Sequence, residues 1–156
     1  MSTRLFIHQV RYQNEFNILL SLSEKLAKLR HALSNFEIQA LRNEPHASNS
    51  THTREKALKT LSAMGALIDE YEAHQPFYPE EIYVSVQKLH SLSWSTLVLT
   101  GYEKNIIEKT ELSKIMIDMI KEKKQGSGVE ETSEVIEDIY AAIRKRVQYW
   151  ENLHFE

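Results

Sequence analysis

The chain has 156 residues, of which 42% are apolar and 26% are charged, and it contains four glycines, three prolines and no cysteine. This composition predicts a single folded domain over residues 1–156. The lack of cysteine excludes disulfide scaffolds, thiolate zinc sites and cysteine nucleophiles. Nineteen Lys and Arg against 22 Asp and Glu give a net charge of −3, so no overall positive field attracts nucleic acid or anionic lipid.

The chain shows no sign of a membrane-spanning or export segment. No stretch approaches the roughly 18 to 20 consecutive apolar residues that a membrane helix needs, and the first residues lack the apolar middle region of a signal peptide. We therefore expect a cytoplasmic protein without a transmembrane segment.

A first helix is expected from about residue 4 to residue 43. Its apolar residues repeat every seven positions, which is typical of a coiled coil and keeps one face of the helix towards a partner. One series is Leu5, Tyr12, Leu19, Leu26, Leu33 and Ala40, and the second is Leu22, Leu29 and Phe36. The predicted helix is about 60 Å long and cannot cover this stripe alone.

A loop over residues 43–51 follows, because the residue before Pro45 is pushed out of the helical region. A second helix is predicted over residues 53–74. Its apolar residues at helical spacing are Leu58, Leu61, Met64, Ile68 and Tyr71.

A third helix is expected to begin at Pro79, because proline suits the first helical position and Glu80 and Glu81 favour the positive end of the helix dipole. Phe77 and Tyr78 are predicted to fold back onto its first turn. We expect this helix to continue to the lysines at 121–124, with a bend near Gly101.

Residues 125–128 end that helix, and Ser127 with Glu130 predicts a capping box for a fourth helix. Its apolar stripe consists of Val135, Ile136, Ile139, Tyr140, Ile143, Val147, Trp150 and Leu153. The predicted fold is therefore all-α, an antiparallel four-helix bundle with two long helices, the first and the third, and two shorter ones, the second and the fourth.

No catalytic residue, cofactor site or metal site is predicted. No two of the seven histidines stand four apart on a helix, and the H-E-x-x-H zinc pattern is absent. Carboxylate pairs such as Glu80 with Glu81 lie at helix starts, where the dipole explains them. The single E-x-x-H match, Glu151 to His154, lacks the second copy that a di-iron site requires.

A divergent HEPN-like ribonuclease is one alternative, because that family includes small all-helical domains. Its active site needs an Arg and a His separated by four to six residues. Arg4 with His8 and Arg42 with His46 are each one residue too close.

A sensor of a phosphorylated ligand or of nucleic acid is another alternative, through the hairpin between the third and fourth helices. The candidate phosphate-binding residues are Lys121, Lys124, Arg144 and Lys145. The acidic residues Glu137, Asp138 and Glu151 interleave with them and favour a solvated surface instead.

Two stretches carry an apolar arc wider than one neighbouring helix would cover. Either they lie in the middle of the bundle, or they form an interface. The candidate interface residues are Trp94, Leu97, Val98, Ile115, Met116, Met119 and Ile120.

The segment Arg11–Phe16, leading to Leu26–Arg30, and the helix start Phe77–Tyr83 resemble a group of uncharacterised bacterial helical proteins. The resemblance implies a cytoplasmic helical bundle behind a single N-terminal membrane helix, with no established activity. Here the chain starts at the bundle, so the resemblance implies either a soluble relative or a membrane-associated protein whose anchor has been removed.

These observations together predict a non-catalytic helical interaction or structural module. Because its apolar surface exceeds what one bundle hides, we expect a homo-oligomer or a complex with a partner protein.

Overall fold

The computed structural model describes residues 2–41, 47–103, 107–122 and 128–154, and no strand occurs in these ranges. The elements in chain order are α1 (Thr3–Leu41), α2 (Ala47–His74), the 3-10 helix η1 (Gln75–Phe77), α3 (Glu80–Glu103), α4 (Glu111–Glu122) and α5 (Val129–His154). The all-α prediction is confirmed.

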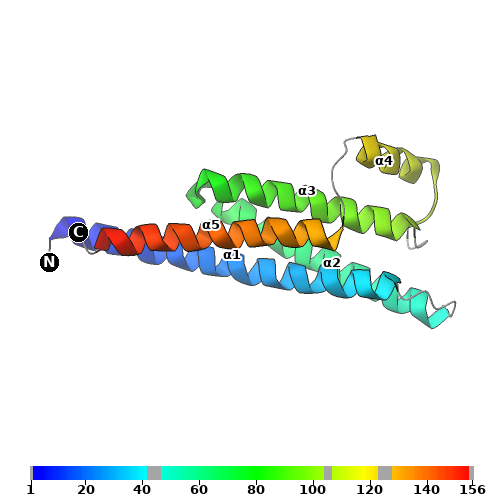
Figure 1. Ribbon diagram of the computed structural model, residues 1–156, viewed down its shortest axis with the longest axis horizontal. Helices are drawn as coiled ribbons and strands as arrows, with labels where there is room; N and C mark the ends of the chain where they lie inside the picture. The colour runs from blue at the N-terminus through cyan, green and yellow to red at the C-terminus, as the bar shows by residue number, and fades with distance from the viewer. Residues whose placement is uncertain (1, 42–46, 104–106, 123–127, 155–156) are drawn as a thin grey trace.

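The helices α1, α2, α3 and α5 lie lengthwise beside one another, and the chain reverses direction from each to the next (Figure 1). α1 packs on α2 and α5, and α3 packs on α5 and α2, so these helices surround one core. The short α4 packs mainly on α3 and stands at the end of the molecule opposite both chain ends (Figure 1).

The core follows the predicted stripe along the middle of α1. Leu22, Leu26, Leu29, Leu33 and Phe36 are completely buried, and each such side chain contributes roughly 1.5–3 kcal/mol when removed from water. The residues that meet them from the other helices include Met64, Leu67, Ile82, Val86, Leu89, Val135, Ile136 and Ile139.

The stripe is not buried along its whole predicted length. Leu5, at the start of the α1 stripe, is exposed. Leu58 and Leu61, which belong to the separate stripe predicted for α2, are exposed as well. The chain turns at η1, and the first turns of α1 and the last turns of α5 extend beyond that turn (Figure 1). We call residues 3–14, at the start of α1, the α1 arm. Ala40 lies outside the residues whose side chains are described.

The predicted start of the third helix is close to the observed one. The backbone N–H groups of Ile82 and Tyr83 both donate to the Pro79 carbonyl at 3.0 Å, and α3 begins at Glu80. Tyr78 is buried and Phe77 is exposed; the Tyr78 hydroxyl donates to the Glu70 carbonyl of α2 at 3.4 Å.

The prediction of one bent helix running past Gly101 is wrong. α3 ends at Glu103, and α4 begins separately at Glu111. The Ile107 N–H donates to the Gly101 carbonyl at 3.0 Å, and a Cβ on Gly101 would lie 2.9 Å from Ile107 Cδ1. The missing side chain thus lets the chain fold back against α3. With 24 residues against 28 in α2, α3 is not one of two long helices.

The other two connections also differ in part from expectation. Residues 47–51, expected in the loop, are helical because α2 begins at Ala47; Pro45 and Ser127 lie outside the described residues. At the start of α5, Gly128 adopts a φ of 125°, a conformation that glycine tolerates best. Its N–H donates to Thr96 Oγ1 at 2.9 Å, which ties α5 to α3.

Candidate interaction surfaces

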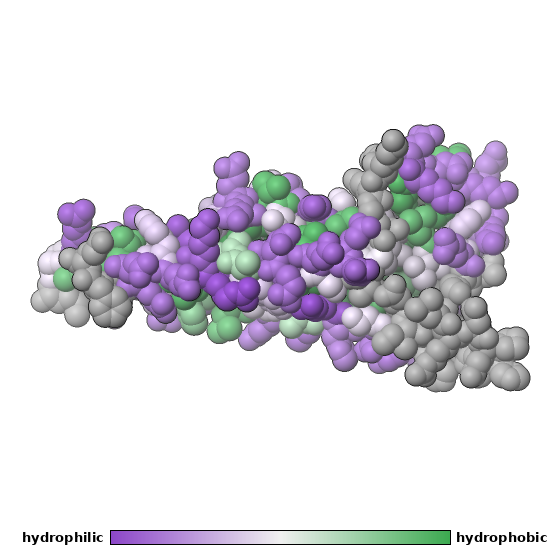
Figure 2. Space-filling model, viewed as in Figure 1, coloured by the Kyte–Doolittle hydropathy of each residue, from purple (hydrophilic) through white to green (hydrophobic). Residues whose placement is uncertain are grey.

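The first candidate surface is a flank of α4, formed by Leu112, Ile115, Met116 and Met119. Their spacing places them along one side of the helix, and Leu112, Ile115 and Met119 are 68%, 52% and 52% exposed. The buried residues of α4 are Ser113 and Ile117 on an adjoining face. Hydrophobic residues gather at this end of the molecule beside a hydrophilic strip (Figure 2). We call this surface the α4 flank.

One edge of the α4 flank carries three carboxylates, and the exposed Lys114 and Lys121 lie next to them on the side away from the apolar residues. Glu111, Asp118 and Glu122 are exposed and follow one another along the helix at positions i, i+7 and i+11, so they line the same side. The opposite edge adjoins the face that packs on α3. A helix docked on the α4 flank would therefore meet carboxylates on its free side.

The structure divides the predicted interface residues between two environments. Ile115, Met116 and Met119 lie together on the α4 flank, with Ile120 half-buried at its margin. Leu97 and Val98 are buried, whereas Trp94 is exposed on α3. Leu97 and Val98 thus belong to the first of the two predicted environments, the interior of the molecule.

The second candidate surface is the α1 arm, of which only Leu5 and Tyr12 were predicted to belong to the buried seam. Leu5, Phe6, Ile7 and Val10 are 54%, 58%, 48% and 42% exposed. Residues 2–14 contain two arginines and no acidic residue. The consecutive apolar residues at 5–7 point in several directions on a helix, a signal that could have indicated more than one apolar face.

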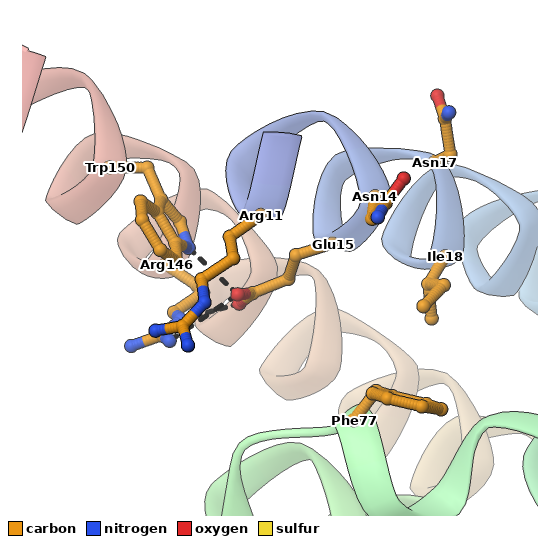
Figure 3. A pocket seen from close by; sticks show the side chains of 8 residues that line it. All are labelled: Arg11, Asn14, Glu15, Asn17, Ile18, Phe77, Arg146 and Trp150. Atoms are coloured by element: carbon orange, nitrogen blue, oxygen red, sulfur yellow. Dashed lines mark hydrogen bonds and ion pairs between the residues drawn. The ribbon is translucent and has the colours of Figure 1, made fainter. Parts of the chain in front are cut away.

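A cleft of about 720 Å³ lies where the α1 arm meets the body, between α1, α5 and η1. Glu15 of α1 accepts a hydrogen bond from Trp150 Nε1 of α5 at 2.9 Å and pairs with Arg146 of α5. The side chains of Glu15 and Arg146 are 14% and 34% exposed. In Figure 3, Arg11 points from α1 towards the same part of the cleft.

The three predicted phosphate-binding residues that the structure describes do not lie together. Lys121 is exposed on α4, whereas Arg144 and Lys145 are exposed in the C-terminal half of α5, which runs away from α4 (Figure 1). Lys124 lies outside the described residues. Their neighbour Arg146 instead lines the cleft, together with Arg11.

The remaining polar clusters can be compared with the needs of a metal site and of a titratable site. In the described ranges, no group of three or more His, Cys, Asp or Glu could hold a metal ion. Tyr71 stacks on Tyr83 with ring centroids 5.5 Å apart and lies 6.2 Å from Tyr78. Burial raises the pKa of Tyr71 to about 12 and raises the pKa of Tyr78 further, so both phenols are neutral at physiological pH.

No protein-family model, curated protein or solved structure matches the chain. Among the described residues, no helix has both the length and the apolar character needed to cross a membrane.

Proposed function

We propose that the protein is a non-catalytic interaction module that binds a second copy of itself. In this proposal α1, α2, α3 and α5 form an antiparallel four-helix bundle that serves as a scaffold. The binding surfaces are the α4 flank and the α1 arm. The observation that carries the proposal is that two exposed apolar surfaces of different charge lie at opposite ends of an elongated molecule (Figure 1).

Charge favours one pairing of these surfaces over another. In an antiparallel pair of two α4 helices the same edges meet, so the carboxylates of Glu111, Asp118 and Glu122 would repel one another. The α1 arm carries Arg4, which is exposed, and no acidic residue. Its apolar and basic character complements the apolar and acidic α4 flank.

The positions of the two surfaces favour a closed dimer. If two copies lie side by side in opposite directions, each α1 arm reaches the α4 flank of the other. A two-fold axis then produces the contact twice, and the assembly closes without exposing a further binding end. Duplication of a small contact is what a stable dimer requires, because specific interfaces bury about 1,200–2,000 Å² in total.

Mass in solution tests the proposal. We expect the wild-type chain to sediment as a dimer and the double variant Ile115→Glu with Met119→Glu to sediment as a monomer. Both residues are about half exposed, so the double variant should keep a cooperative melt close to that of the wild type. Leu58→Glu, which changes an exposed leucine on α2, is the matched control and should remain dimeric.

A wild-type chain that stays monomeric at high concentration would overturn the proposal. A double variant that loses its cooperative melt would place Ile115 and Met119 in the core and would also count against it. Equal dissociation of the Leu58→Glu control would mean that added charge anywhere on the surface, rather than the α4 flank, controls association.

A further inference from the structure

We propose that the cleft between α1, α5 and η1 binds a small ligand with an oxyanion group attached to an apolar body. Arg11 and Arg146 would hold the oxyanion, and Trp150 and Phe77 would contact the apolar part. All residues of this site belong to one copy of the chain, although Arg11 also lies in the α1 arm.

The cleft exists because helices of unequal length meet there. The chain turns at η1 between α2 and α3, while α1 and α5 continue beyond the turn (Figure 1). The resulting hollow, about 720 Å³ in volume, is within the range of roughly 300–1,000 Å³ that is typical of small-molecule sites. Phe77 of η1 is an exposed aromatic side chain that forms part of its wall.

The charge of the cleft indicates an anionic ligand. Its charged lining residues are Arg11, Glu15 and Arg146, so one positive charge is not compensated within it. Glu15 is already bound by Arg146 and by Trp150 Nε1. The Arg11 side chain has neither an ion pair nor a hydrogen bond to any other described residue, and it points towards the same region (Figure 3).

Arg146 is held in place before any ligand arrives. Its Nε and, at 3.4 Å, its Nη2 donate to the Glu15 carboxylate, so the Nη1 side of the guanidinium is the part left for a ligand. The guanidinium lies 4.9 Å from the Tyr149 ring centroid and 5.4 Å from that of Trp150. A fixed guanidinium loses little conformational freedom on binding. The planar fork of arginine also matches carboxylate and phosphate oxygens, which are the two sources of the proposed oxyanion.

Trp150 offers a direct readout. The chain has two tryptophans, so Trp94→Phe leaves Trp150 as the only one. We would titrate this variant at constant ionic strength with benzoate, phenyl phosphate, inorganic phosphate and the neutral benzamide, and follow tryptophan fluorescence. We expect a saturable change with benzoate or phenyl phosphate, weaker binding of inorganic phosphate and no response to benzamide.

Arg11→Gln should weaken binding about tenfold, or about 1.4 kcal/mol, without changing the melting temperature, because Arg11 is exposed. Lys28→Gln, on an exposed position of the same helix outside the cleft, is the matched control and should bind within about twofold of the parent. A response to only one of the two aromatic anions supports the site and identifies the oxyanion as carboxylate or phosphate.

The proposal is overturned if neither aromatic anion gives a saturable response, or if benzamide binds equally well. If Lys28→Gln weakens ligand binding as much as Arg11→Gln does, the loss in both variants comes from general electrostatic attraction and not from a contact in the cleft. If inorganic phosphate binds as tightly as phenyl phosphate, the cleft binds the oxyanion alone, and the proposed contact with an apolar body is wrong.

Discussion

Glu15 shows how one polar residue can replace an apolar contact between two helices. It lies on α1 seven residues before the fully buried Leu22, at a position where the heptad pattern favours an apolar residue. Instead, its carboxylate binds Arg146 and Trp150 of α5. A buried carboxylate is tolerated when its oxygens are paired in this way.

We expect Glu15→Gln to lower the free energy of unfolding by about 1–3 kcal/mol, because Arg146 loses its charged partner in a partly buried site. The control is Glu137→Gln, which breaks the more exposed pair between Arg30 and Glu137 and should cost no more than about 1 kcal/mol. Chemical denaturation measures both. Equal costs would contradict the structural role given to Glu15.

The raised pKa values of Tyr71 and Tyr78 predict that the folded protein loses stability at alkaline pH. Their pKa values in the folded state are raised by burial, that of Tyr71 to about 12, whereas an unfolded tyrosine has a pKa of about 10. The neutral phenols therefore favour the folded state fully below about pH 10, and this contribution is lost as the pH rises towards 12.

We expect the melting temperature to stay level from about pH 7 to pH 9 and to fall above about pH 10. In the variant Tyr71→Phe with Tyr78→Phe the fall above pH 10 should be smaller. Thermal melts across this range test the prediction. An identical alkaline fall in the double variant would assign the effect to other groups.

At the scale of the elements, α4 is a locally capped helix with little support from the body. Thr110 Oγ1 accepts a hydrogen bond from the Ser113 N–H at 3.1 Å, and Ser113 Oγ accepts one from the Thr110 N–H at 2.8 Å. This reciprocal arrangement satisfies amide groups that a helix start leaves unpaired. Only Ser113 and Ile117 of α4 are buried.

Thr110→Ala should destabilise α4 by about 0.5–2 kcal/mol. Because α4 packs mainly on α3 alone, we expect faster amide exchange over residues 111–122 with little change in the global melt. Ser62→Ala, at an exposed position within α2, is the control and should change neither the amide exchange of residues 111–122 nor the global melt. A large drop in the global melting temperature would show instead that α4 supports the whole fold.

The sequence was sufficient to predict the all-α fold, the buried run from Leu19 to Phe36 and the start of α3 near Pro79. It was not sufficient to predict the break after Glu103, because the apolar residues before and after Gly101 continue at helical spacing. The deciding contact, Ile107 on Gly101, is tertiary. The cleft combines residues of α1, η1 and α5, which periodicity within each helix cannot bring together.

At the scale of the whole molecule, the proposed dimer depends on surfaces at opposite ends. Residues 2–14 contain Arg4 and no acidic residue, and the edge of the α4 flank carries Asp118. Association should therefore respond to exchange of these charges and should weaken at high salt, because the charges are exposed.

Arg4→Glu should weaken the dimer about threefold to tenfold, and combining it with Asp118→Lys should restore most of the affinity. Sedimentation at several protein concentrations measures the dissociation constants. If the combined variant is weaker than Arg4→Glu alone, the α1 arm and the α4 flank are not partners.

The first turn of α1 and the last turn of α5 lie at the same pole of the molecule (Figure 1). A fluorescent protein or affinity tag fused at either end of the chain would therefore sit beside the α1 arm. In the proposed dimer it would block the contact of the α1 arm, and moving the tag from one end of the chain to the other would not remove this block. An internal insertion after α4 places a dye at the far pole. Energy transfer between such a dye on one copy and a terminal dye on another would report antiparallel alignment directly.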